Sequence, residues 1–219
     1  MTAHCIDCEP AILPHLNPSD RQLLAAASSS LSMRDPYTAR HSARVARYAV
    51  RVAQEIGLNN QDCARIFLSA RLHDIGKLAF DDVLFTGCHH RLTPSQLGQV
   101  RHHPVNGADY MRAAGYRGSA VAFVLCHHER LDGTGYPRGI KGDRIPIGAQ
   151  VISIADCFDA LTSDRPYQKR REPEKALDVL RTCGGRLYNT DLVEVLAGNV
   201  TLHPSNWAAF RPELCDGNG

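Results

Sequence analysis

The sequence has few aromatic residues, no excess of either charge and no long apolar stretch. Aromatic side chains make up 6% of the 219 residues, and 25 basic residues against 23 acidic ones give a net charge of +2. A balance this even gives no reason to expect a nucleic-acid polymer as a partner. The longest apolar runs, such as 120–125, are far shorter than the stretch that a bilayer requires, so no membrane span is predicted.

The N-terminus also lacks an export signal. Its first ten residues, MTAHCIDCEP, have no basic start followed by an apolar stretch, which predicts a cytoplasmic protein. Cys63, Cys126 and Cys157 fall inside apolar helical patterns, where reduced thiols serve as small packing residues. Cys5 and Cys8 form a CxxC, but nothing nearby supplies the other half of a zinc site. The sequence therefore favours packing roles over metal or redox roles for the thiols.

Strand signals are scarce, whereas apolar residues recur at helical spacing along most of the chain. Asp35-Pro36 is a cap followed by proline at the first helical position, and Thr93 opens a capping box. Pro104 is expected to interrupt or restart the helix that begins there. The fold class predicted from this pattern is all-α. Helices are predicted over 19–31, 36–56, 60–74, from 93 onward, and over 117–128, 150–162, 173–181 and a short segment beginning near 189.

The chain divides into three predicted parts. Residues 1–34 form an N-terminal helical extension, 35–197 form the main domain, and 198–219 form a tail without clear periodicity. Within the domain, 131–148 is rich in Gly and Pro and is predicted to be a loop. Such loops in compact domains tend to bind something, so we favour recognition by this loop over a mere connector.

Histidine and aspartate residues occur where the predicted helices converge. Asp156 lies inside the apolar helix GAQVISIADCFDALT, and a buried carboxylate without a partner is costly. A metal ion is the partner that the other residues suggest, because imidazole and carboxylate together suit Fe, Mn, Zn or Ni. The candidate ligands are His41, His73, Asp74, His103, His127, His128 and Asp156.

These candidates outnumber the needs of one ion. His41, His73, Asp74 and Asp156 make one plausible set, and His103, His127 and His128 make a second that Asp74 could share through its two oxygens. Two ions about 3.5–4 Å apart are a known device for in-line phosphoryl displacement. Asp74 is therefore a candidate for a catalytic role as well as a ligand.

Lys77 follows Asp74 by about one helical turn, which places its ammonium group near the same face. It is a candidate catalytic and substrate-binding residue, because a compact cation can hold a phosphate oxygen or a water molecule. Gly133 and Gly135 permit unusual backbone angles, and Pro137 stiffens the turn. The loop can thereby direct Tyr136 at a ligand or a protein partner.

Five segments of the sequence together resemble the HD-GYP domains, a branch of the HD superfamily of metal-dependent phosphohydrolases. They are DPYTARHSARV, LHDIGK, HHP, HHERLDGTGYP and ADCFDALTSDRPY, which occur in the family's order between about 35 and 195. The resemblance implies a helical bundle around a binuclear metal centre, commonly of iron or manganese. It also implies hydrolysis of cyclic di-GMP to pGpG and, in some members, to GMP, or hydrolysis of cyclic GMP-AMP.

Carried onto this chain, the resemblance implies the same seven metal ligands, with His103 rather than His102. Lys77 matches the family's lysine near the metals, and Arg165 in SDRPY matches a residue that contacts substrate. Three departures stand out. Tyr37 replaces the Glu of trimetallic members, which favours two ions. Gln168 follows RPY in place of a basic residue. The segment after Lys77, AFDDVLFTGCHHRL, lacks the family's Lys-Pro-Gly.

Two alternatives to a cyclic dinucleotide phosphodiesterase stay open. The first is a non-hydrolysing module that binds a cyclic dinucleotide or docks a partner through 131–148. The second is an HD phosphohydrolase acting on another nucleotide, which the altered segment after Lys77 would favour. The 34-residue extension suggests a dimer-forming helix or a linker remnant, so a homodimer is also considered.

Overall fold

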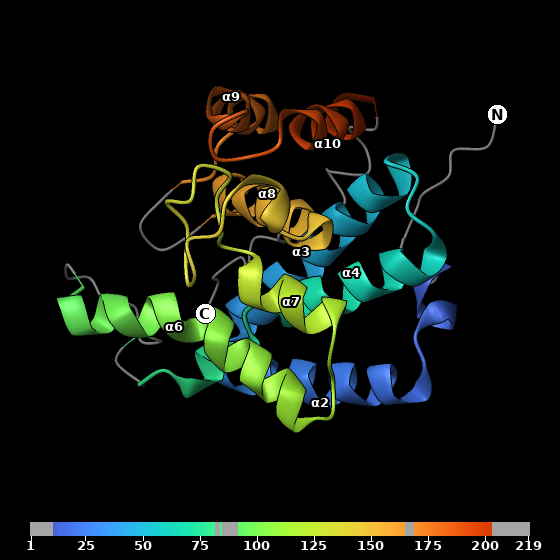
Figure 1. The fold of residues 1–219 in the computed structure, drawn as a ribbon, viewed down its shortest axis with the longest axis vertical. Helices are drawn as coiled ribbons and strands as arrows, with labels where there is room; N and C mark the ends of the chain where they lie inside the picture. The colour runs from blue at the N-terminus through green and yellow to red at the C-terminus, as the bar shows by residue number, and fades with distance from the viewer. Residues whose placement is uncertain (1–10, 82–83, 85–91, 165–168, 203–219) are drawn as a thin grey trace, which may run out of the picture.

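The computed structural model describes residues 11–81, 84, 92–164 and 169–202 (Figure 1). Within these ranges the regular structure is helical, with one isolated bridge between Gly184 and Tyr188, so the all-α prediction is confirmed. The elements are η1 (Leu13–His15), α2 (Pro18–Arg34), α3 (Pro36–Glu55), α4 (Asn60–Leu72), η2 (Ile75–Ala79), α6 (Pro94–Ala113), α7 (Ser119–Cys126), η3 (Gly142–Arg144), α8 (Ile147–Thr162), α9 (Pro173–Cys183) and α10 (Thr190–Leu202).

Helix α3 lies at the centre of the fold, where it packs against α4 and α8. Its apolar residues recur at the helical period, so Val45, Ala49 and Val52 are all fully buried. In Figure 1, α9 and α10 cover α8 at one end of the molecule, and α2 and α6 lie at the other end. The central helices are therefore shielded on both sides, and polar side chains that they bury must find partners inside the protein.

The start of α3 is fixed by its cap. The Asp35 carboxylate accepts hydrogen bonds from the backbone N–H groups of Tyr37 and Thr38 at 3.0 and 3.1 Å, and Pro36 occupies the first turn. Caps of this kind stabilise a helix by about 1 kcal/mol. The predicted helix start is confirmed, and it puts His41 on the buried face of α3, where it is 3% exposed.

The expectation that Pro104 interrupts its helix is wrong. Helix α6 runs unbroken through Pro104 from Pro94 to Ala113. A proline inside a helix lacks the N–H that would bond to the carbonyl four residues earlier, here that of Val100. The ring Nδ1 of His103 donates to that carbonyl instead, at 2.6 Å, so the acceptor is satisfied and the helix continues.

The predicted division of the chain into three parts stays a prediction, but the structure describes helices at both ends of the main domain. Helix α2 packs against α3 and α4, and its residues Ala27 and Leu31 are buried in the same core. Helix α10 continues to Leu202, so the first five residues assigned to the tail are helical, and Val200 among them is 4% exposed. The extension thus contributes to the core that holds the predicted site.

None of the helices in the described ranges is long and apolar enough to cross a bilayer. The predicted packing roles of Cys63, Cys126 and Cys157 agree with the structure, since all three are free thiols that lie in the hydrophobic core or pack against it. The CxxC of Cys5 and Cys8 lies outside the described residues.

Candidate metal centre

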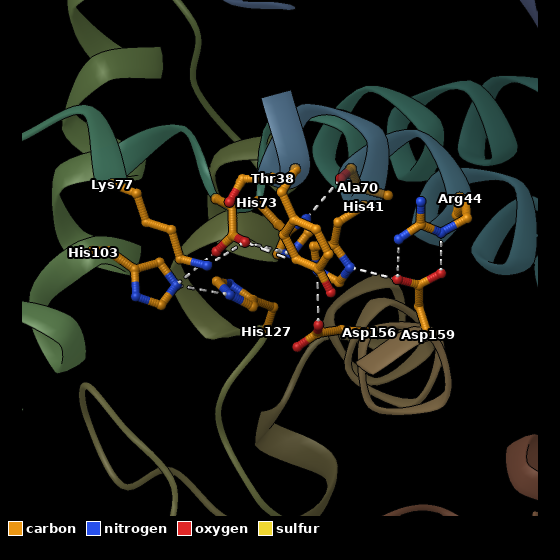
Figure 2. Close-up of polar contacts among 12 residues, drawn as sticks. Thr38, His41, Arg44, Ala70, His73, Lys77, His103, His127, Asp156 and Asp159 are labelled. Carbon is orange, nitrogen blue, oxygen red and sulfur yellow. Dashed lines mark hydrogen bonds and ion pairs between the residues drawn. The ribbon is translucent and has the colours of Figure 1, made fainter. Parts of the chain in front are cut away.

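The candidate ligands come from separate elements that meet beside the central helix α3. His41 is on α3, His73 ends α4, Asp74 begins η2, and Asp156 is on α8. Figure 2 shows the side chains of His41, His73 and Asp156 facing one another, together with His103 from α6 and His127 from the end of α7. Two groups have ligand atoms within 4.8 Å of one another: His41, His73 and Asp74, and His103, His127 and His128. The second group is the second set that the sequence suggested, and the first group contains three of the four residues of the first set. Asp156, the fourth, lies beside that group with its Oδ1 3.1 Å from Nε2 of His41.

Asp74 lies between the two groups with one oxygen toward each. Its Oδ1 is 3.3 Å from Nε2 of His103, and its Oδ2 is 3.4 Å from Nε2 of His73 and 3.9 Å from Nε2 of His41. The carboxylate is 2% exposed. This is the arrangement expected of a carboxylate shared by two neighbouring ions.

The protonated ring nitrogens of three histidines can be assigned from their acceptors. Nδ1 of His73, His103 and His127 lies 2.6–2.8 Å from the backbone carbonyl three residues earlier in each case. A carbonyl only accepts, so each Nδ1 carries the proton and each Nε2 presents a lone pair. The three lone pairs therefore point into the space between the helices.

Those lone pairs need a cation. Nε2 of His73 is buried without a hydrogen-bond partner, and Nε2 of His103 lies 3.2 Å from Nε2 of His127, where two lone pairs would face each other. Buried polar atoms without partners are rare and costly. Divalent ions held by the two groups would satisfy these nitrogens, so the residues fit the metal centre that the family resemblance implies.

The protonation of the second group agrees with ligand roles. Burial lowers the pKa of His103 to about 4 and the pKa of His128 to about 3. Burial and the neighbouring imidazoles also hold the pKa of His127 well below its usual value. All three rings are consequently neutral at pH 7 and can bind a cation without first losing a proton.

His41 differs because two carboxylates hold it. Its Nε2 is 3.1 Å from Asp156 and its Nδ1 is 2.7 Å from Asp159. Burial disfavours the charged ring, but these hydrogen bonds outweigh burial and raise the pKa of His41 to about 9. Arg44 donates to the same Asp159 carboxylate at 2.6 and 2.9 Å. Carboxylates that hold the outer nitrogen of a ligand histidine fix its orientation.

The sequence interpretation missed Asp159 and Arg44. Asp159 is fully buried, one turn after Asp156 on the same apolar helix, and Arg44 lies one turn after His41. The reasoning that singled out Asp156, a carboxylate in an apolar helix, applies equally to Asp159. The i,i+3 spacing of both pairs was the available signal.

Lys77 lies where the sequence placed it. Its ammonium group is 2.6 Å from Oδ2 of Asp74, and its side chain is 27% exposed. Burial opposes ionisation of Asp74, but the positive charge of Lys77 and the nearby histidines hold the pKa of Asp74 well below its usual range. The ammonium group of Lys77 therefore contacts the buried carboxylate of Asp74 from the more exposed side of the site.

The Gly-rich loop forms a wall of the site rather than a free connector. The ring of Tyr136 lies 4.7 Å from the ring of His128, and the guanidinium of Arg101 lies 5.8 Å above Tyr136. Glu129 is 3% exposed, and its carboxylate accepts from the backbone N–H groups of Arg138 and Ile140. The sequence interpretation missed this anchor, although Glu129 directly follows the two ligand histidines.

Gly135 explains how the loop comes so close to the ligands. A Cβ at this position would lie 2.5 Å from the carbonyl oxygen of His128 and 2.4 Å from the backbone nitrogen of Arg130. Only glycine fits such an approach. It lets the loop pack directly on the segment that carries His128, which brings Tyr136 to the site.

A second close approach joins η2 to α6. A Cβ on Gly76 would lie 2.0 Å from the His103 carbonyl oxygen and 2.5 Å from the Gly107 nitrogen. The two backbones are therefore in direct contact, two residues after Asp74. This contact sets the distance between Asp74 and His103, and with it the distance between the two ligand groups.

Residues 26–192 match the sequence model of a family described as HD domain. The chain belongs to the HD domain family. The matched residues include the His73-Asp74 pair, which lies at the centre of the site described above. The match also supports the resemblance to the HD-GYP branch.

Three curated relatives of this HD domain have names that state an activity. Cyclic di-GMP phosphodiesterase response regulator RpfG of Xanthomonas campestris is 34% identical over 181 residues, covering 81% of this chain and 47% of the relative. Cyclic di-GMP phosphodiesterase of Thermotoga maritima is 36% identical, covering 74% and 44%. 3'3'-cGAMP-specific phosphodiesterase 3 of Vibrio cholerae is 34% identical, covering 78% and 38%. The chain thus spans less than half the length of these relatives.

Solved structures share the fold of this HD domain. A cyclic GMP-AMP specific phosphodiesterase of V. cholerae superposes with a TM-score of 0.66 at 16% identity, covering 89% of this chain and 51% of that one. The HD domain of the L. monocytogenes phosphodiesterase PgpH, in complex with cyclic-di-AMP, gives 0.63 at 19% identity, covering 82% and 96%. At sequence identities of 16% and 19%, this structural likeness establishes the fold alone.

Some predicted features fall outside the part of this HD domain that the structure describes. They are Arg165, Gln168 and most of the altered segment after Lys77. Arg165 therefore stays a predicted substrate contact. His102, which the sequence analysis rejected in favour of His103, is exposed beside its buried neighbour.

Proposed function

We propose that this chain is a metal-dependent phosphodiesterase that hydrolyses a cyclic dinucleotide, with cyclic di-GMP as the first candidate and pGpG or GMP as product. The observation that carries the proposal is Asp74, whose two oxygens face two separate histidine groups. A shared carboxylate of this kind suits a pair of ions acting on a phosphodiester. The names of the curated relatives support the substrate class.

The proposed ligands of two transition-metal ions are the seven residues predicted from the sequence. His41, His73, Asp74 and Asp156 would hold one ion, and His103, His127 and His128 the other, with Asp74 shared. The imidazole and carboxylate donors suit Fe, Mn, Zn or Ni, and the resemblance to the HD-GYP domains favours iron or manganese among them. When bound, such ions supply Lewis acidity and lower the pKa of water.

Tyr37 supports two ions rather than three. Its ring lies parallel to that of His41 with 6.5 Å between ring centres. This position carries Glu in the trimetallic members that the chain otherwise resembles. A phenol is a poor substitute for a carboxylate as a ligand of a hard divalent ion.

Three residues of the chain are proposed to bind the substrate. One N–H of the Lys77 ammonium is used by Asp74, and its two remaining donors can hold a non-bridging phosphate oxygen. Tyr136 presents its ring beside His128 and can stack on a base. Arg165 is the proposed second contact to phosphate or guanine, which rests on the resemblance alone.

The test compares three substrates with the purified protein loaded anaerobically with Fe²⁺ or Mn²⁺. Metal content is measured first, and the protein is then incubated with cyclic di-GMP, 3'3'-cGAMP or cyclic di-AMP. We expect hydrolysis of at least one, with linear dinucleotide or mononucleotide released. A loaded protein inert on all three would favour another nucleotide as substrate, and binding without hydrolysis would favour the non-hydrolysing module.

A variant pair tests the site itself. Replacing both His73 and Asp74 with Ala should abolish turnover and strip the metal, because it removes one ligand of the first ion and the carboxylate shared by both. His102→Ala is the control, since His102 is exposed and outside both ligand groups. Full activity in the double variant would refute the assignment.

Three further predictions accompany the proposal. A protein partner that docks on 131–148, a homodimer formed through the N-terminal extension, and a cytoplasmic location all stay predictions from the sequence. The buried anchor of the loop at Glu129 is compatible with a docking surface of fixed shape.

A further inference from the structure

Pro104 lies in the middle of α6, directly after the proposed ligand His103. It is buried, and the helix continues for nine residues beyond it to Ala113. Proline is unfavourable in a helix interior because it lacks an N–H and its ring presses on the carbonyl four residues earlier. That carbonyl belongs to Val100, and Nδ1 of His103 donates to it at 2.6 Å.

Two other ligands use the same bond at ordinary helix ends. His73 follows the last residue of α4 and donates to the carbonyl of Ala70 at 2.8 Å. His127 follows the last residue of α7 and donates to the carbonyl of Val124 at 2.7 Å. The last four carbonyls of a helix have no partner within the helix, so both acceptors are available for a side chain.

His103 has no helix end to provide such an acceptor. With any residue other than proline at position 104, the Val100 carbonyl would bond to the N–H of that residue. Proline at 104 removes this competitor and thereby creates, in mid-helix, the free carbonyl that a helix end provides elsewhere. The three bonds have the same spacing, from each histidine to the carbonyl three residues earlier.

We propose that Pro104 is a positioning residue of the metal centre, which fixes the proton of His103 on Nδ1 by leaving the Val100 carbonyl free to accept it. The consequence is that Nε2 of His103 always presents its lone pair toward His127 and Asp74. With an N–H at position 104, a backbone donor would compete with His103 for the Val100 carbonyl, and a weaker bond would let the ring of His103 rotate or exchange its proton between the two nitrogens. The expected effect on metal binding rests on the proposed function, whereas the hydrogen bond from His103 to the Val100 carbonyl does not.

The closing experiment uses the full chain in its metal-free form and then with Mn²⁺. In the wild type, ¹⁵N NMR of the imidazoles should show His103 as the Nδ1–H tautomer. In Pro104→Ala, the restored N–H should compete for Val100, so the His103 signal should shift toward a mixture of tautomers. Calorimetric titration with Mn²⁺ should then show an affinity lower by about 10–100-fold, which is the usual effect of losing a hydrogen bond that orients a ligand.

Pro94→Ala is the matched control. Pro94 belongs to the same helix but occupies its first turn, where the missing N–H would have no partner within the helix. This variant should keep the wild-type tautomer of His103 and the wild-type Mn²⁺ affinity. Pro104→Ala should retain its fold by circular dichroism, because the substitution adds a hydrogen bond to the helix.

The possible outcomes separate this proposal from the proposed function. An Nε2–H tautomer in the wild type, an unchanged tautomer and affinity in Pro104→Ala, or loss of its fold would each overturn the role of Pro104. If the wild type itself binds no Mn²⁺ or other divalent metal, the proposed function fails, while the tautomer comparison still decides whether Pro104 fixes the proton of His103.

Discussion

Arg44 holds the carboxylate of Asp159 through two hydrogen bonds of 2.6 and 2.9 Å, deep beneath the metal site. The same carboxylate accepts the Nδ1 proton of His41 at 2.7 Å. A guanidinium that binds both oxygens of a carboxylate fixes its plane as well as its position. The orientation of His41 is therefore set by a chain of contacts that runs from α3 to α8 and back.

Asp159→Asn should damage both stability and metal binding. It leaves the buried guanidinium of Arg44 without its counter-charge, and breaking a buried pair typically costs about 3–5 kcal/mol in the free energy of unfolding. It should also weaken Mn²⁺ binding by about 10–100-fold, because His41 loses the carboxylate that orients it. Urea unfolding of the metal-free protein and calorimetric titration measure the two effects separately.

Glu194→Gln provides the comparison for this variant. Glu194 also receives two hydrogen bonds from an arginine, Arg181, but the carboxylate side chain is 53% exposed. Exposed pairs contribute less than about 1 kcal/mol. If Glu194→Gln lowered the free energy of unfolding as much as Asp159→Asn, burial would not be the reason why the Arg44–Asp159 pair stabilises the fold.

Lys77→Met should separate catalysis from metal binding. The ammonium lies 2.6 Å from Asp74 but belongs to neither ligand group, so the metal should remain. Removing a positive charge beside the site should leave Mn²⁺ affinity equal or higher. Losing a donor to the reacting phosphate typically lowers kcat by about 10²–10³-fold. Rates with metal-saturated protein test this, and Lys175→Met, at an exposed position on α9, should change neither quantity.

The histidines and aspartates of the site could be predicted from the sequence because their positions conflict with their surroundings. Asp156 lies in an apolar helix, and His73-Asp74 ends another, so local patterns alone mark them as unusual. Helix periodicity likewise predicted most of the fold, including the capped start of α3 at Asp35. These features depend on neighbours in the chain, which a sequence displays.

The features that escaped prediction depend on contacts between distant segments. Pro104 was expected to interrupt α6 because the rule for proline counts only backbone donors, whereas the His103 side chain supplies the bond. Asp159 carries the same local signal as Asp156, but its pairing with Arg44, 115 positions earlier in the chain, appears only in the folded structure. Glu129 has its partners in a loop whose course the sequence does not specify.

Gly76→Ala should push the two halves of the metal centre apart. The added methyl would lie 2.0 Å from the His103 carbonyl oxygen, a contact with backbone that no side-chain rotation can relieve. Overpacking of this kind typically costs about 1–3 kcal/mol of stability. Because Asp74 and His103 move with their backbones, Mn²⁺ affinity should fall as well, which titration of the folded variant would show.

Gly98→Ala is the matched change for this prediction. Gly98 lies on α6, the helix that Gly76 contacts, but a methyl group there would meet nothing within 4 Å. Alanine should stabilise this exposed helical position by about 1 kcal/mol relative to glycine. If both variants lost metal affinity equally, close packing of Gly76 on α6 would not be the cause.

The metal-free protein should be most stable near pH 6.5. His103 and His128, with pKa values of about 4 and 3, stay neutral in the fold while the unfolded chain takes up protons near 6.5, so stability falls as the pH drops from 6.5 toward 4. His41, with a pKa raised to about 9, binds its proton more tightly when folded. The stability that His41 contributes is fully present below pH 6.5 and is lost as the pH rises to 9.

Thermal unfolding of chelator-treated protein from pH 4 to 9 tests this profile, and single variants assign its two sides. His103→Gln should make the acidic side less steep, because one of the two groups that must be kept neutral is gone while His128 remains. His41→Gln should flatten the alkaline side, because no ring remains to lose its proton to solvent. A Tm that rises steadily to pH 9 in the wild type would mean that Asp156 and Asp159 do not hold a proton on His41, contrary to their distances of 3.1 and 2.7 Å.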